Sequence, residues 1–152
     1  MDISFQEVQL SSLTPPQLKM LHDQLDQEIE VLTSSMQSLK GAQNQFNESK
    51  QSLKTICPKN VGKDILVPLT GSLYVPGQLA DADSVLVDIG TGYYAEKTLT
   101  DADEFFKRKI DYLKQQMDKL QPAVQQKFQS RQVVYEMLQA KVMAHAKQQS
   151  KK

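Results

Sequence analysis

Apolar residues recur every three or four positions in two long stretches of the chain, which flank a shorter stretch with a different pattern. In the second long stretch, gaps of three and four alternate from Phe106 to Val124, and the pattern resumes at Val134. Heptads sustained over this length predict long helices that pair along an apolar seam. In the first stretch the residues seven apart are all apolar: Leu18, Leu25, Leu32, Leu39, Phe46 and Leu53.

The first helix is predicted over residues 15–57, because both of its ends carry recognisable signals. Thr14 suits the N-cap, Pro15 suits the first helical position, and Gln17 completes a capping box. The end is expected just before Pro58, since a residue that precedes proline avoids the helical region of backbone space.

The second helix is predicted over residues 101–148, with Thr100 as its N-cap. Pro122 falls in the middle of this helix, where it should bend the axis or loosen one turn. Lys127 and Arg131 interrupt the apolar seam at two positions.

Between the helices, residues 64–98 predict two β-hairpins, because β-branched and aromatic residues alternate with polar ones and turn residues punctuate them. No amphipathic helix lies within this insert to cover its apolar side chains, and two hairpins alone are rarely stable in water. We therefore expect other chains to complete the sheet, with folding back onto the chain's own helices as the alternative. The strands are expected at Asp64–Leu69, Ser72–Leu79, Ser84–Ile89 and Gly92–Thr98. The residues expected to mediate subunit assembly are Leu66, Val67, Leu69, Leu73, Tyr74, Val75, Val85, Val87, Ile89, Tyr93 and Tyr94.

The chain as a whole, residues 1–152, is predicted to be a single α+β domain that is mainly α. Because the insert returns the chain to the end at which it began, the two helices should pair antiparallel. Placing Ile56 beside Phe105 puts Leu18 near Val142.

This pairing gathers apolar residues at the helix ends farthest from the hairpins. Two interpretations explain these residues equally well. They pack in the ordinary seam between the helices, or they form an exposed, methionine-containing patch that binds unrelated apolar ligands. The residues of this candidate client-binding tip are Leu10, Leu13, Leu18, Met20, Leu21, Met137, Leu138, Val142 and Met143.

Composition excludes several classes of function. Lys plus Arg and Asp plus Glu both number 18, so no net charge attracts the chain to nucleic acid or to a membrane surface. The lone Cys57 fits a reducing compartment, and neither a signal peptide nor a membrane span is expected. His22 and His145 are too few for a metal site and are expected at the surface, and no grouping of residues supports catalysis or a cofactor.

The hairpin motifs resemble those of the prefoldin family, specifically its alpha-class subunits, which carry two hairpins between their helices. The most specific run is Asp-Ile-Gly-Thr-Gly-Tyr-Tyr at residues 88–94, supported by Leu-Val-Pro-Leu at 66–69 and Leu-Tyr-Val-Pro-Gly at 73–77. Phe-Phe-Lys-Arg-Lys-Ile-Asp at 105–111 is similar to the start of the family's second helix. The resemblance covers roughly residues 10–140.

The resemblance implies a heterohexamer of two alpha-class and four beta-class subunits, whose hairpins form a β-barrel body from which coiled coils extend. The partners would be one further alpha-class subunit, four beta-class subunits, non-native clients such as actin and tubulin, and the cytosolic chaperonin. Capture would need no ATP and no other cofactor. The expected location is the cytoplasm, with a nuclear pool also allowed.

The residues themselves also allow a second class of function. A coiled-coil scaffold or tether would use the same helices to dock one defined, folded partner. A chaperone should instead bind several unrelated denatured proteins.

Overall fold

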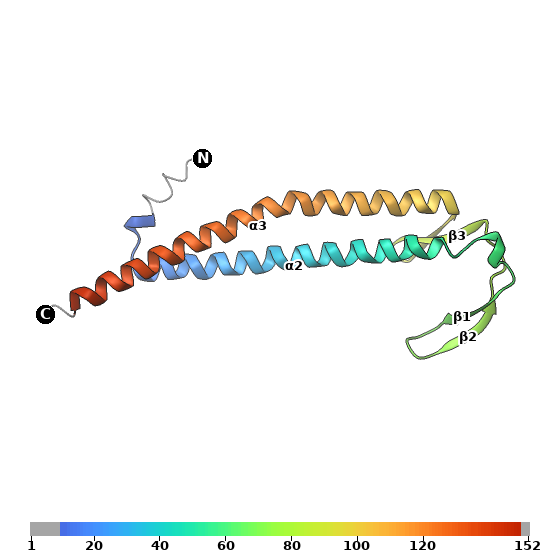
Figure 1. Ribbon diagram of the computed structural model, residues 1–152, viewed down its shortest axis with the longest axis horizontal. Helices are drawn as coiled ribbons and strands as arrows, with labels where there is room; N and C mark the ends of the chain where they lie inside the picture. Colours follow the sequence, from blue (N-terminus) through green and yellow to red (C-terminus); the bar gives the residue numbers. More distant parts are fainter. Residues whose placement is uncertain (1–9, 150–152) are drawn as a thin grey trace. The chain divides into compact units, whose positions relative to one another are not determined.

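The chain is a mainly helical protein in which two long helices flank two β-hairpins, and this arrangement confirms the predicted fold class (Figure 1). The computed structural model describes residues 10–149. Helix α2 spans Pro15–Leu53 and helix α3 spans Leu99–Gln149. Neither of these two described helices is long and apolar enough to cross a membrane.

The strands form two separate antiparallel pairs with no hydrogen-bonded ladder between them. In the first pair Val67 lies opposite Val75, and in the second Val87 lies opposite Ala95. The strands are β1 (Asp64–Pro68), β2 (Tyr74–Gln78), β3 (Ser84–Gly90) and β4 (Tyr93–Thr98).

Helix α2 begins at the predicted start signal. The Thr14 N–H donates to Oε1 of Gln17 at 2.9 Å, which is the Gln17 half of the capping box. The Thr14 carbonyl accepts the first helical bond, from the Leu18 N–H at 2.9 Å. The cap therefore fixes the start of α2 through contacts made within residues 14–18 alone.

Helix α2 ends at Leu53, four residues before the predicted end at residue 57. The N–H groups of Lys54, Thr55 and Ile56 each donate to the carbonyl three residues earlier, at 3.1 Å, so the last turn tightens. Cys57 is extended and precedes a short 3₁₀ turn, Pro58–Asn60. Cys57 is thus extended, as expected of a residue before proline, but the helix ends a full turn before Cys57.

Helix α3 begins two residues before its predicted start, and the expected N-cap Thr100 is wrong. The Thr98 hydroxyl oxygen accepts a hydrogen bond from the Asp101 N–H at 3.1 Å, so Thr98 caps the helix. The last residue of β4 and the cap of α3 are therefore the same residue. Pro122 lies inside α3 without ending it.

The chain forms two compact units, each with its own apolar cluster. The first unit combines residues up to Leu39 with those from Gln116 onward, and the second is Lys40–Gln115. The two long helices pass through both units, whereas the hairpins belong to the second alone.

In the first unit, ion pairs join the helices where the apolar seam is interrupted. Lys127 contacts Glu28 at 2.6 Å and Arg131 contacts Asp26 at 2.8 Å, so the helices run antiparallel here. The basic residues that break the seam of α3 are thus matched by carboxylates of α2.

The predicted helix register is wrong in this unit. Leu18 is 0% exposed and packs with Leu25 and Val134, whereas Val142 is 54% exposed. The prediction assumed that α2 continues to Ile56 before the chain turns. Because α2 ends earlier and α3 begins earlier, residues about two turns nearer the start of α3 come opposite Leu18.

We predict that the Glu28–Lys127 pair makes the free energy of unfolding depend on pH in the acidic range. Hydrogen bonds from Lys127 and Gln24 lower the pKa of Glu28 from its usual value of 4.5. A carboxyl with a lowered pKa stabilises the fold above its unfolded pKa, and this contribution disappears as the pH falls through the lower folded pKa. Glu28→Gln should therefore reduce the urea midpoint at neutral pH. The difference in midpoint between the variant and the unaltered chain should become smaller below about pH 4.5.

Urea unfolding followed by circular dichroism at several pH values, at low protein concentration, measures this difference. Glu30→Gln is the control, because Glu30 is an exposed carboxylate two positions after Glu28 on the same helix. A Glu28→Gln effect that does not vary with pH would contradict the prediction.

Candidate binding surfaces

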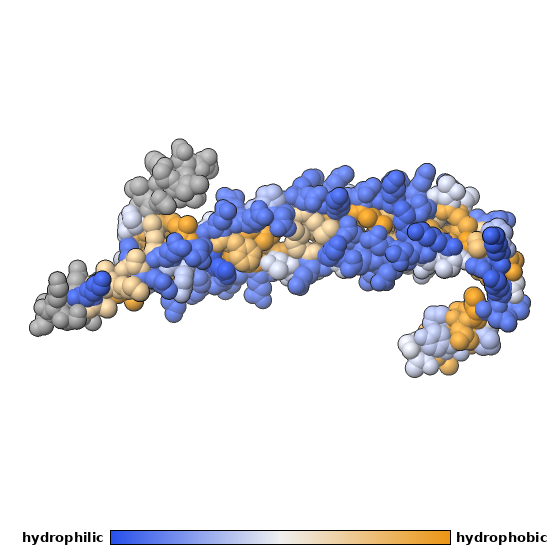
Figure 2. Space-filling view, in the orientation of Figure 1, coloured by the Kyte–Doolittle hydropathy of each residue, from blue (hydrophilic) through white to orange (hydrophobic). Residues whose placement is uncertain are grey.

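The β1–β2 hairpin is apolar and uncovered on both of its faces. Every residue of β1 is exposed, and only Gly77 of β2 is partly covered. Ile65 and Leu66 are neighbours that point to opposite faces, yet both are exposed. Figure 2 shows hydrophobic side chains on the surface of this hairpin. A two-stranded sheet of this kind has no packing partner among the described residues of the second unit.

The β3–β4 hairpin differs, because one of its faces packs on the chain's own helices. Val87 is 4% exposed and packs against Ala102 and Phe106 at the beginning of α3. Phe46 and Leu53 at the end of α2 complete the contact. The small side chain of Ala102, which is fully buried, lets the strand approach the helix closely. On this face the hairpin therefore folds back onto the chain's own helices, which was the alternative, and completion of the sheet by other chains stays a prediction.

Other side chains of β3–β4 stay open. Leu86 is 71% exposed, and Tyr93 and Tyr94, neighbours that point to opposite faces, are also exposed. Regular alternation along β3 would put Ile89 on the same face as Val87, but a β-bulge shifts the register between Asp88 and Gly90, and Ile89 is exposed. Gly90, Thr91 and Gly92 all have positive φ, which makes the tight turn after the bulge.

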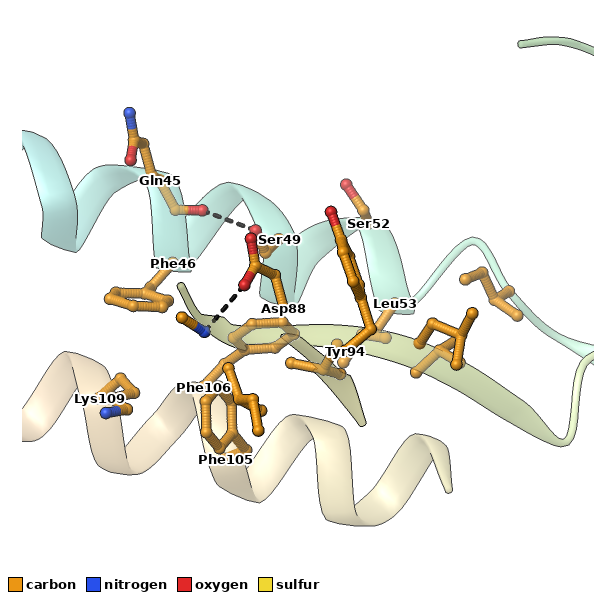
Figure 3. A pocket seen from close by; sticks show the side chains of 16 residues that line it. Gln45, Phe46, Ser49, Ser52, Leu53, Asp88, Tyr94, Phe105, Phe106 and Lys109 are labelled. Carbon is orange, nitrogen blue, oxygen red and sulfur yellow. Dashed lines mark hydrogen bonds between the residues drawn. The ribbon is translucent and has the colours of Figure 1, made fainter. Parts of the chain in front are cut away.

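A cavity of 810 Å³ opens beneath β3, between the end of α2 and the beginning of α3 (Figure 3). Aromatic rings form much of its wall: the centroids of Phe46 and Phe106 lie 6.2 Å apart, and those of Phe105 and Phe106 lie 5.6 Å apart. The Asp88 carboxylate, at the edge, accepts a hydrogen bond from the Gly90 N–H at 2.8 Å. An apolar side chain from another protein would fit this lining.

Positive charge surrounds the aromatic wall of this cavity. The ammonium nitrogens of Lys97 and Lys109 lie 5.6 and 5.5 Å from the centre of the Phe105 ring, and the Arg108 guanidinium lies 6.0 Å from it. Such cation–π contacts hold the ring in place. The hairpin surface is thus apolar at its centre and basic along the side that borders α3.

The structure places most of the predicted assembly residues on open surface. Val85 and Val87 are the exceptions, since the chain's own helices cover Val85 in part and Val87 almost completely. Their role in assembly stays a prediction, because their burial needs no partner. Two further exposed apolar residues, Ile65 and Leu86, were missed, although each lies in a run of three consecutive apolar residues, which was a signal that both faces of the strand are apolar. The predicted assembly residues that are exposed are Leu66, Val67, Leu69, Leu73, Tyr74, Val75, Ile89, Tyr93 and Tyr94.

In the first unit, the predicted tip residues fall into three groups. Leu18 is a core residue of the helix pair and presents no free surface. The residues half-buried against the Leu18 cluster are Leu10, Leu13, Leu21, Met137 and Leu138. Met20, Val142 and Met143 are exposed, Met20 to the extent of 73%. Seam packing therefore accounts for Leu18, whereas Met20, Val142 and Met143 form an exposed apolar set whose binding role stays a prediction.

His22 is half-buried rather than at the surface, and it lies in an ion-pair network. Its Nδ1 atom is 3.2 Å from Asp26 and 3.7 Å from Asp23, and its ring lies 5.9 Å from that of Tyr135. Ligand atoms of this group lie within 4.8 Å of one another, but the Arg131 guanidinium already binds Asp26. Charge pairing between helices accounts for the cluster.

Comparison with known proteins agrees with this geometry. Residues 25–144 match the family described as "Prefoldin subunit". Prefoldin subunit 5 of Homo sapiens is 51% identical over 137 residues, which cover 90% of this chain and 89% of the relative. Probable prefoldin subunit 5 of Dictyostelium discoideum is 39% identical over 145 residues, covering 95% of this chain and 90% of the relative.

A solved structure has a similar fold. The filamentous PFD of Methanocaldococcus jannaschii, determined by cryo-EM, superposes with a TM-score of 0.66 at 21% sequence identity. The match covers 76% of this chain and 95% of that chain.

We predict that the purified chain self-associates when it has no partner. The exposed edges and apolar faces of β1–β2 are the cause, since an open edge pairs with any strand available to it. Sedimentation velocity at micromolar concentration should show oligomers. Replacing Leu66, Tyr74 and Leu73 by serine should shift the population toward monomer, whereas a stable monomer of the unaltered chain would contradict the prediction.

Proposed function

The chain belongs to the prefoldin family of chaperone subunits, and on this basis we propose that it is an alpha-class subunit of a heterohexameric, ATP-independent chaperone. Its partners would be one further alpha-class subunit and four beta-class subunits. The complex would capture non-native chains such as actin and tubulin and transfer them to the cytosolic chaperonin. This activity would take place in the cytoplasm.

The uncovered β1–β2 hairpin is the observation that carries the assembly part of the proposal. An apolar two-stranded sheet without a packing partner costs the chain free energy until another surface covers it. Strand addition from neighbouring subunits would cover both its edges and its faces, as a β-barrel does. The cavity beneath β3 gives a neighbour's apolar side chain a second point of attachment.

The open apolar residues of the first unit support the client-binding part. Met20 and Met143 have flexible, polarisable side chains that adapt to ligands of different shape. Each apolar side chain is worth up to roughly 1.5–3 kcal/mol when a client buries it completely. Several used together give useful affinity, while no single contact selects one sequence, which suits unrelated clients.

We predict that Leu86→Asp blocks assembly and leaves the fold of the subunit intact. Leu86 is 71% exposed, although it lies along the cavity beneath β3, so the charge is hydrated in the free chain. Buried at a subunit interface without a partner, the same charge would cost several kcal/mol. Mixing the variant with the partner subunits and measuring the complex by size exclusion tests this.

Val31→Asp is the matched control, because it places the same charge at an exposed apolar position of α2 in the other unit. Val87→Asp would not serve, since Val87 lies in the chain's own core. Normal assembly of Leu86→Asp would remove this face of β3 from the interface.

We also predict that serine at Met20, Val142 and Met143 weakens client capture without affecting assembly. The three side chains are exposed in the first unit, so the variant removes apolar contacts with a client and leaves the Leu18 cluster in place. The measurement is suppression of aggregation of denatured actin, followed by light scattering. The loss should be partial when only this subunit is altered, because five other subunits keep their surfaces in the proposed hexamer.

The control for this experiment is Val31→Ser with Tyr112→Ser, which removes exposed apolar side chains elsewhere on α2 and α3. Repeating the assay with an unrelated denatured protein distinguishes a chaperone from a tether. Full protection after the corresponding surfaces of every subunit are altered would place capture elsewhere.

A further inference from the structure

Residues 10–13 of the chain cover part of the apolar surface of the first unit. Residues 10–12 form a helical turn, and the Leu13 N–H donates to the Leu10 carbonyl at 3.2 Å. This spacing puts Leu10 and Leu13 on the same side of the turn. Both pack against the cluster of Leu18, Leu25 and Val134, next to the other half-buried residues, Leu21, Met137 and Leu138.

Lys141 of α3 binds backbone carbonyls of this segment. Its ammonium donates to the Ser11 carbonyl at 2.6 Å and also to the Leu13 carbonyl. Carbonyls at the end of a helical turn lack partners within the turn, which makes them good acceptors for a cation. These contacts use two apolar side chains one turn apart and carbonyls that every polypeptide has.

The segment can leave without unfolding α2. The cap formed by Thr14 and Gln17 and the first helical bond to Leu18 involve no atom of residues 10–13. Pro15 and Pro16 follow immediately, and a residue that precedes proline does not continue a helix. Residues 10–13 are thus a separate ligand-like piece, joined to α2 at Thr14.

We propose that residues 10–13 act as an internal ligand, in the place where a short apolar segment of an unfolded protein binds. Such a segment, with two leucine-like residues one turn apart, displaces residues 10–13 and receives the Lys141 hydrogen bonds on its own carbonyls. This inference rests on the proposed function, which supplies the displacing chain.

The competing explanation is that residues 10–13 only stabilise the helix pair. The two explanations predict opposite signs when the segment is weakened. An internal ligand competes with the client, so its loss should raise the apparent affinity by the reciprocal of the fraction of time that the site is open. If residues 10–13 only stabilise the helix pair, weakening their contacts should disturb the apolar surface and weaken client capture.

The test uses the assembled complex with a photo-crosslinking residue in place of Met143, which reports capture at this subunit alone. The probe is reduced, carboxymethylated α-lactalbumin, which cannot refold. Leu10→Ser with Leu13→Ser should lower the apparent Kd on the order of tenfold if the segment covers the surface about nine-tenths of the time. The control pair Val31→Ser with Tyr112→Ser should leave the Kd unchanged. Equal or weaker capture by the Leu10/Leu13 variant would overturn the proposal.

Hydrogen exchange on the complex without substitutions in residues 10–13 provides a second measurement. Adding the probe should speed exchange at the Leu13 amide, whereas the Leu18 amide, which donates to the Thr14 carbonyl at 2.9 Å, should stay protected. A Leu13 amide that stays protected while the probe crosslinks would overturn the internal-ligand proposal and leave the proposed function intact. Absence of crosslinking in every variant would overturn both.

The role of Lys141 is tested in the Leu10/Leu13 variant, where the segment no longer competes. Lys141→Gln should then reverse part of the gain in affinity, because the client loses a donor to its carbonyls. Lys119→Gln, an exposed lysine of the same helix, should not. An equal effect of both substitutions would show that Lys141 acts only through its charge.

Discussion

The packing of β3 on the two helices is the contact on which the arrangement of the hairpins depends. Val87 lies on the buried Ala102, with Phe106 and Phe46 on either side, and this anchors one face of the second hairpin. Thr98 then ends β4 and caps α3, so strand and helix meet without a linker. The first hairpin receives no such support and offers both of its faces to a partner. One hairpin of the chain thus packs on the chain's own helices, whereas the other is exposed on both faces.

The sequence predicted the elements well and their pairing less well. The heptads identified both helices, because an apolar seam is a local and repeated signal. Helix register depends on the residues at which the chain leaves α2 and enters α3, and both positions were set by hydrogen bonds of single residues. Thr98 and Thr100 have the same side chain, and nothing local to them shows which hydroxyl will cap the helix. The earlier end of α2 and the earlier start of α3 together moved the expected partner of Leu18.

Burial was predicted in the strands of the insert, and on β3 the chain's own helices, which were the alternative to other chains, provide it. Alternation in β3 showed that one face is apolar, but alternation alone cannot say whether a helix of the same chain or another subunit covers it. Val87 and Leu86 are adjacent, apolar and β-compatible, yet one is buried and the other is open. The deciding residue is Ala102, whose small size matters only once the strand lies on the helix. Likewise, Lys127 and Arg131 interrupt the seam in the sequence and connect the helices in the structure.

The contact between β3 and α3 determines when the second hairpin can pack during synthesis. Ala102 and Phe106 come after the strand they cover, so the second hairpin has nothing to pack against until the first turns of α3 have been made. The first hairpin is finished earlier still and gains no cover from any later described part of the second unit. Completing synthesis therefore does not remove the exposure that invites aggregation of nascent chains. A cell that makes this chain in excess of its partner subunits would contain unassembled copies that are prone to aggregate. Balanced synthesis of the subunits would therefore limit aggregation.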